Sequence, residues 1–186
     1  MKKLTLFPVT SVDELAHPEA PQALDMHSPA MKFFTDFRET EPLVIDASVS
    51  APEALKMMVS THVRMKLVVD DEGHFSGIVS ADDLTEQAIV ARVGNSRSAR
   101  HDIKVADLMT RKKDLLALDI AEVAKSSIGD VIHFLKDNSR QHCLVIDEET
   151  HQICGIFSAS DISRKLKLPI NIQEQSSFYR VFSAVS

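Results

Sequence analysis

The feature that most constrains the fold is an eight-residue phrase that occurs twice. GIVSADDL occupies residues 77–84, and GIFSASDI occupies residues 155–162. The match extends upstream, where KLVVDDEGHFSG aligns with CLVIDEETHQICG and the second copy has one extra residue in its turn. A short apolar run, a polar turn and a second apolar segment predict two strands joined as a hairpin. An internal repeat of this length predicts two copies of one structural unit.

A helix is expected before each hairpin. Ser50 with Glu53, and Ser127 with Asp130, have the spacing of a capping box, in which a serine and an acidic residue satisfy free N–H groups at a helix start. Apolar residues follow at helical spacing in both copies. A second helix is expected after each phrase, in SADDLTEQAIVARV and in SASDISRKLKL.

Each copy is therefore predicted to have the order β-α-β-β-α, which places the chain in the α/β (α+β) class. PLVIDA (42–47) is the expected first strand of the first copy, and the corresponding strand of the second copy falls within 114–123. A half of about 60 residues is marginal alone. We therefore expect the two copies to pack sheet to sheet with pseudo-twofold symmetry.

The predicted organisation has five parts. They are an N-terminal extended arm (1–30), a first repeat (31–90), a linker (91–103), a second repeat (104–168) and a C-terminal tail (169–186). In the tail, Phe178, Val181 and Phe182 have helical spacing and predict a short packing or interface element.

Composition argues against several classes of partner. The chain has 21 basic and 27 acidic residues and a formal net charge of −6, which opposes general binding to nucleic acid or anionic lipid. No stretch approaches the ~20 apolar residues of a membrane span, and the apolar run near the N-terminus is too short for a signal peptide. We expect a cytoplasmic protein with two free thiols, Cys143 and Cys154. The basic residues in and near the linker are interpreted as a solvated connector: Arg92, Arg97, Arg100, Arg111, Lys112 and Lys113.

The repeats resemble a tandem pair of cystathionine-β-synthase-type (CBS) domains, known as a Bateman module. VADLMT at the start of the second copy and the two helix–hairpin segments carry the resemblance, which covers roughly residues 31–168. It implies a regulatory module and not an enzyme, with no catalytic cofactor. It also implies a homodimer that binds AMP, ADP, ATP or S-adenosylmethionine in clefts between the repeats and signals to a partner protein.

By this resemblance, the two phrases hold the ribose and the first phosphate. A carboxylate can accept hydrogen bonds from both ribose hydroxyls, and a helix N-terminus attracts phosphate. The implied contacts are ribose contacts from Asp83 and Asp161, phosphate contacts from Ser80 and Ser158, and close backbone approach at Gly77 and Gly155. In the alternative interpretation, each serine and aspartate only caps the helix that follows.

The adenine ring would lie against apolar residues of the first strand. The expected walls are Val44 and Ile45 in the first copy, and Ile103 and Val105 in the second copy, with ordinary core packing as the alternative. Further phosphates need cations where each helix meets its strand. The candidates there are Arg64, Lys66, Arg140 and His142, for which a solvated surface is the alternative.

The sequence also contains residues that could suggest a metal site or a hydrolase site. His142, Cys143, His151 and Cys154 are residue types that bind zinc, but the first copy has no equivalent ligands, so we predict no metal site. GIVSA and GIFSA lack the second glycine of the G-x-S-x-G motif, which argues against a hydrolase. The alternative function is a structural dimerisation or interaction module with degenerate pockets that bind no ligand.

Overall fold

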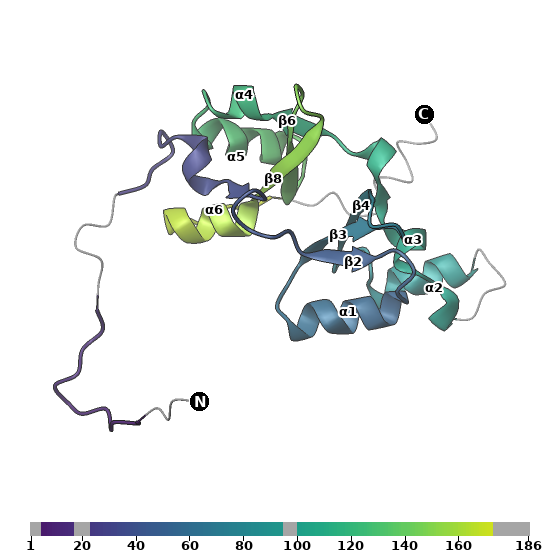
Figure 1. Cartoon of the computed structure of the whole chain (residues 1–186), viewed down its shortest axis with the longest axis horizontal. Helices are drawn as coiled ribbons and strands as arrows, with labels where there is room; N and C mark the ends of the chain where they lie inside the picture. The colour runs from purple at the N-terminus through teal and green to yellow at the C-terminus, as the bar shows by residue number, and fades with distance from the viewer. Residues whose placement is uncertain (1–4, 17–22, 95–99, 173–186) are drawn as a thin grey trace.

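A computed structural model describes residues 5–16, 23–94 and 100–172. Most of these residues form two halves. Each half is a four-stranded sheet covered by helices (Figure 1). The first half has the strand order β2-β3-β4-β5, and the second half has the order β1-β8-β7-β6. The mixed α/β class and the repeated β-α-β-β-α unit are therefore confirmed.

The strands are β1 (Thr35–Asp36), β2 (Val44–Asp46), β3 (Met65–Val69), β4 (Phe75–Ser80), β5 (Thr110–Arg111), β6 (Ala117–Asp119), β7 (His142–Asp147) and β8 (Gln152–Ser158). The α-helices are α1 (Ala51–Ser60), α2 (Glu86–Gly94), α3 (Val105–Leu108), α4 (Ile120–Val123), α5 (Ile128–Asp137) and α6 (Ala159–Leu166). Three 3-10 turns, η1 (Ala30–Phe33), η2 (Arg100–Asp102) and η3 (Lys112–Asp114), complete the described elements.

The repeated unit forms as its sequence predicts. In the first half, helix α1 connects β2 to β3, and the two strands pair in parallel. Strand β3 then pairs antiparallel with β4 through a tight turn. In the second half, β6, β7 and β8 pair in the same way. The extra residue of the second turn is accommodated by His151, which has a φ of 56°, whereas Gly73 has a φ of 84° in the first turn.

The fourth strand of each sheet comes from the other half of the sequence. Strand β1 pairs with β8 in the second half, and β5 pairs with β4 in the first half. We call residues 26–36 and 101–111 the leading segments. Each runs beside the start of a helix in the opposite unit, where Pro29 forms a bridge with Ser127 and Lys104 forms a bridge with Ser50.

This exchange places the leading segment of each repeat in the opposite half. Ala30 and Phe33 are buried in the core of the second half, although the sequence assigned them to the arm and the first repeat. Leu24 and Met26 pack against the same core, so the end of the predicted arm belongs to the folded body. The segment lies against the second sheet because its apolar side chains are buried there.

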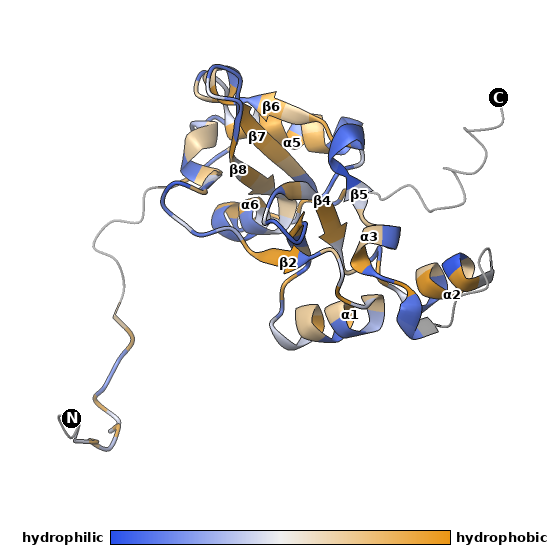
Figure 2. Cartoon of the chain, turned by 45° about the vertical axis from the view of Figure 1, so that its right-hand side comes forward, coloured by the Kyte–Doolittle hydropathy of each residue, from blue (hydrophilic) through white to orange (hydrophobic). Residues whose placement is uncertain are grey.

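Three apolar clusters hold the molecule together. One fills the first half, and one fills the second half. The third lies between the two sheets, where Leu67 of β3 meets Leu144 of β7 and Ile156 of β8. Hydrophobic colour accordingly runs along β4, β7 and β8 where the halves meet (Figure 2). The expected sheet-to-sheet packing therefore rests on buried apolar side chains from both copies.

The predicted capping boxes form in only one of the two upstream helices. Ser127 caps α5, with its Oγ accepting from the Asp130 N–H and the Asp130 carboxylate accepting from the Ser127 N–H. Ser50 makes no side-chain cap. In both halves the leading segment supplies a backbone acceptor to the first helical residue: the Ala51 N–H donates to the Ile103 carbonyl at 2.8 Å, and the Ile128 N–H donates to the Ser28 carbonyl at 2.9 Å.

Two expectations fall partly outside this description. The helical spacing of Phe178, Val181 and Phe182 lies beyond residue 172, and residues 95–99 of the predicted linker are also outside the described residues. Among the described helices, none has the length and apolar character to cross a membrane.

Candidate functional site

Both repeated phrases end a strand beside the start of its hairpin partner. Ser80, the last residue of β4, pairs with Met65 at the start of β3, and Ser158 of β8 pairs with His142 of β7. Each half therefore brings its serine and aspartate next to the helix-to-strand joint that carries the basic residues. In each half, one strand end and one joint form a candidate site, and the two sites are related by the repeat.

In the first half, Ser80 and Asp83 bind each other. The N–H and the hydroxyl of Ser80 donate to Asp83 Oδ2 at 2.8 Å and 2.7 Å, and the Asp83 N–H donates to Ser80 Oγ at 3.2 Å. This is the hydrogen-bond pattern of a capping box. Helix α2 does not begin there, however, since residues 81–85 form a turn and the helix starts at Glu86.

In the second half, the equivalent residues are arranged differently. Helix α6 begins directly after Ser158, but the serine makes no cap, and its Oγ is 2.8 Å from Ser160 Oγ. Asp161 instead forms an ion pair of 2.9 Å with Arg164, one turn further along the helix. The predicted capping box is thus absent here, and the two carboxylates lie in different local environments.

The first strand of the first half presents one of its two predicted walls to solvent. Val44 is 47% exposed, whereas Ile45 is buried in the core of the first half. The Lys66 ammonium donates to the Val44 carbonyl oxygen at 3.3 Å. An exposed apolar residue and a cation therefore lie side by side at this strand, while Ile45 packs in the core.

The two residues predicted as walls of the second copy lie in the first half. Ile103 and Val105 are buried in the core of the first half because the leading segment that carries them is exchanged. The residues of the second half that match Val44 and Ile45 in sheet register are Ala117 and Leu118 of β6. Sequence comparison missed them because the four residues of α4 are inserted between β6 and α5, which shifts the alignment.

The two repeated glycines have a structural role. A Cβ on Gly77 would overlap the carbonyl oxygen of Thr110 in β5, and a Cβ on Gly155 would overlap that of Thr35 in β1. The backbone that approaches each glycine closely is therefore the exchanged leading segment of this chain. A close approach of ligand to Gly77 and Gly155 stays a prediction.

Charged groups of both halves act on His142. Burial lowers the pKa of His142 below its usual value; the Asp161 carboxylate opposes this shift, and Arg64 of the first half adds to it. Asp82, also from the first half, raises the pKa. Charges from opposite halves are thus close enough to influence one histidine. Among the described residues, neither Arg64 nor Arg140 has an ion-pair partner within 4 Å.

The described residues give no support to a metal site. They contain no group of three His, Cys, Asp or Glu side chains placed to hold an ion. The Cys143 thiol donates to the Leu144 carbonyl oxygen, and the Cys154 thiol donates to that of Val145. Burial raises the pKa of Cys143 to about 11, so this thiol is protonated at neutral pH.

A concave surface lies away from these residues. A groove of about 500 Å³ runs between α1 and α2 on the outer side of the first half. Its lining includes Leu55, Val59 and Ile89 and none of the predicted nucleotide-binding residues.

Comparison with known proteins gives a match over both repeats. The family model described as CBS domain matches residues 35–89 and 105–168. An uncharacterized conserved protein from Pyrococcus horikoshii has a similar structure, with a TM-score of 0.57 and 24% identity over 81% of this chain and all of that chain.

Two further solved structures were determined with ligands. CBSX2, a protein of Arabidopsis thaliana, was solved in complex with AMP and matches with a TM-score of 0.54 and 23% identity, over 74% of this chain and 94% of that chain. The CBS domain pair of protein MJ0100, solved with 5′-methylthioadenosine and S-adenosyl-L-methionine, matches with a TM-score of 0.50 and 18% identity, over 74% and 98% of the two chains. At these identities the likeness concerns the fold.

One curated protein also matches a short segment. Hemolysin C of Brachyspira hyodysenteriae is 43% identical over 49 residues, which is 26% of this chain and 18% of that protein. The chain therefore spans less than a fifth of that relative.

Proposed function

Because this chain belongs to the CBS domain family, we propose that it is a regulatory module that binds an adenosine-containing ligand and signals to a partner protein. The ligand is AMP, ADP, ATP or S-adenosylmethionine, held at the sites formed by the strand ends of both halves. The role is regulatory and not catalytic. Binding changes the partner only to the extent that the ligand prefers one arrangement of the two halves, or of a homodimer, over another.

One observation carries this proposal: in each half, the serine of the repeated phrase lies beside the joint that carries the basic residues, with Ser80 paired to Met65 and Ser158 paired to His142. Charged groups of both halves, Arg64 and Asp82 from the first and Asp161 from the second, also act on the pKa of His142. Arg64 and Arg140, which have no ion-pair partner among the described residues, supply bidentate donors for phosphate at the two joints. Carboxylates at the strand ends supply acceptors for a ribose diol. The AMP complex of CBSX2 and the adenosine-ligand complex of MJ0100 support the same ligand class.

The first site is the better candidate for adenine. Val44 offers an exposed apolar surface for a ring, and Lys66 lies beside it for an anionic group. Asp83 keeps Oδ1 available while Oδ2 accepts from Ser80. In the second site, Ala117 offers less apolar surface, and a ribose must compete with Arg164 for Asp161. We therefore propose unequal affinities, with the first site binding more tightly.

Thermal unfolding of the full chain, freed of bound nucleotide by unfolding and refolding, tests the proposal. AMP, ADP, ATP, S-adenosylmethionine and a cyclic dinucleotide are added in turn, with GMP as the matched control for the base. A ligand at ~100 times its dissociation constant adds about 2.7 kcal/mol of stability. This corresponds to a rise of about 5–10 °C in Tm. If no adenosine ligand raises Tm more than GMP does, the proposal is wrong.

The alternative is an interaction module whose sites bind no ligand. It is favoured by the contacts that both carboxylates already make within the chain, Asp83 with Ser80 and Asp161 with Arg164. The same titration separates the two functions, since this alternative requires that no adenosine ligand binds while the chain still associates with itself or with a partner. Sedimentation of the ligand-free chain at several concentrations measures self-association directly.

A further inference from the structure

The two repeated aspartates have partners of different charge. Asp161 lies 2.9 Å from the guanidinium of Arg164, whereas Asp83 accepts from the neutral hydroxyl of Ser80. The residue of the first half that matches Arg164 in the repeat is Glu86, which has the opposite charge. A ligand that binds the Asp161 carboxylate therefore displaces a cation, whereas a ligand that binds Asp83 does not.

The residue before each aspartate also differs in charge. It is Asp82 in the first half and Ser160 in the second half, and both side chains are exposed. The Asp82 carboxylate raises the pKa of His142 in the second half, so its negative charge acts across the boundary between the halves. An anionic ligand therefore meets one more negative charge at the first site than at the second.

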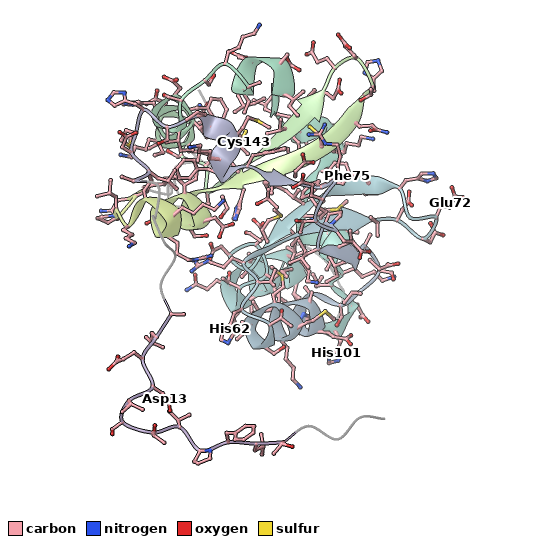
Figure 3. The ribbon with its side chains drawn as sticks, turned by 60° about the vertical axis from the view of Figure 1, so that its left-hand side comes forward. Asp13, His62, Glu72, Phe75, His101 and Cys143 are labelled. Carbon is pink, nitrogen blue, oxygen red and sulfur yellow. The ribbon has the colours of Figure 1, made fainter. Side chains whose placement is uncertain are left out.

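The segments that lead into the two sites have opposite net charges. We call residues 37–43 and 112–116, which join β1 to β2 and β5 to β6, the crossing segments. Their charged residues are Arg38, Glu39 and Glu41 in the first segment, and Lys112, Lys113 and Asp114 in the second, which gives net charges of −1 and +1. The Lys112 ammonium lies 5.9 Å from the ring centroid of Phe75, where the two sheets meet (Figure 3).

The crossing segments end beside the joints of the two candidate sites. The first enters β2, which pairs in parallel with β3, and the second enters β6, which pairs in parallel with β7. The starts of β3 and β7 carry the basic residues of the joints, so each crossing segment contributes its charge at the entry to one site. Surface charges act over about 8 Å at physiological salt.

All three contrasts act in the same direction on a phosphate. They favour a phosphate dianion at the second site and disfavour it at the first. The guanidinium of Arg164, once displaced from Asp161 by a ribose diol, can also donate two hydrogen bonds to a phosphate of the same ligand. S-adenosylmethionine carries a net positive charge and no phosphate, so it leaves this guanidinium without a partner.

Resting on the proposed function, we propose that the two sites divide adenosine ligands by charge and that Arg164 sets this selectivity. The second site takes a nucleotide that carries phosphate. The first site keeps the larger apolar surface at Val44 and takes an adenosine ligand with or without phosphate. One chain can therefore hold S-adenosylmethionine in the first site and AMP in the second at the same time.

Calorimetric titration of the full chain, freed of bound nucleotide by unfolding and refolding, tests the division. We expect AMP to fill two sites per chain and S-adenosylmethionine to fill one. Equal numbers of sites for the two ligands would overturn the division and leave the proposed function intact. If neither ligand binds, the proposed function is wrong, and the division fails with it.

Arg164→Gln tests the residue that sets the selectivity. Lys167→Gln removes the same charge from an exposed residue just after α6 and is the matched control. We expect Arg164→Gln to weaken AMP about tenfold at the weaker of its two sites, because a charge-assisted contact to phosphate is lost. The affinity for S-adenosylmethionine should stay unchanged. A rise in AMP affinity would mean that Arg164 only competes for Asp161, and it would overturn the proposal.

Ser160→Asp gives the second site the charge that the first site has at this position. Ala121→Asp adds the same charge at the second residue of α4, as Ser160 is the second residue of α6, and is the matched control in the same half. We expect Ser160→Asp to weaken AMP at the second site about threefold at low salt, and less in 0.5 M salt. Equal effects of the two substitutions would contradict the role of local charge.

Discussion

The carbonyl oxygen of Thr35 lies against Gly155 where β1 pairs with β8, and it fills the space that a Cβ would need. The same relationship joins Thr110 to Gly77 in the other half. Each repeated glycine therefore allows the leading segment of the opposite copy to complete the sheet. The glycines of the two phrases are explained by packing within the chain before any ligand is considered.

Replacing either glycine by alanine should destabilise the protein without any ligand present. Gly77→Ala and Gly155→Ala force backbone apart in a packed sheet, which costs about 1–3 kcal/mol. Gly94→Ala is the control, because a Cβ there meets nothing within 4 Å. Urea unfolding measures the change in midpoint. If Gly155→Ala unfolds like Gly94→Ala, the close packing of β1 on β8 is not present in solution.

Phe33→Ala should weaken the second half first. Phe33 is 1% exposed in the core of that half, and truncating a buried phenylalanine costs about 3–5 kcal/mol. Leu43→Ala, at an exposed residue in the following loop, is the control. Phe33→Ala should accelerate amide hydrogen exchange more in α5 than in α1. A faster response in α1 would restore the sequence-based assignment of Phe33 to the first repeat.

Asp83→Asn should weaken binding of the adenosine ligand by about tenfold or more, since hydrogen bonds to a charged group contribute about 1.5–3 kcal/mol. Asp71→Asn removes the same charge from the exposed turn between β3 and β4 and is the control. Calorimetric titration of each variant gives the affinity and the number of sites. Asp161→Asn should change the tighter site less, and the opposite order would assign that site to the second half.

Acid should destabilise the protein partly through His142. Burial lowers the pKa of this histidine in the folded state, so the unfolded chain binds the proton more readily. Its contribution is complete above the unfolded pKa of about 6.5 and is lost as pH falls through the lower folded value. His142→Gln should therefore flatten the fall in Tm between about pH 7 and pH 5. The exposed His101→Gln controls for loss of a histidine elsewhere, and an unchanged slope in His142→Gln would contradict this explanation.

Cys143 should resist alkylation while the protein is folded. A pKa of about 11 leaves roughly a hundredfold less thiolate at pH 8 than an ordinary cysteine has, and the side chain is 3% exposed. Iodoacetamide labelling followed by mass spectrometry should therefore show modification of Cys143 only after denaturant is added. Rapid labelling of the native chain would show that β7 opens readily.

The elements that depend on local sequence were predictable. The runs at Leu67 and Leu144 form the expected strands, and Ser127 caps its helix as its spacing indicates. The exchange of leading segments was not predictable, because residues 26–36 and 101–111 share only Thr35 and Thr110 at equivalent positions. Their partners lie far away along the chain, so neither local spacing nor the visible repeat indicates them.

The same exchange decides where the predicted cleft walls of the second copy lie. The position of Ile103 and Val105 before the second copy predicts them as cleft walls, and the exchange buries them in the core of the first half. Ser50 has the right spacing for a cap but makes no side-chain hydrogen bond to α1. The roles of Asp83 and Asp161 as ribose ligands remain predictions that the titrations above decide.

Because the leading segments are exchanged, each half needs the other repeat to complete its sheet. A single repeat carries a strand that its own sheet does not use and leaves an edge that its own sequence does not cover. Such a repeat gains a complete sheet only by pairing with a second copy through a mutual domain swap. The present chain therefore has the arrangement that two separate repeats would adopt in a domain-swapped dimer.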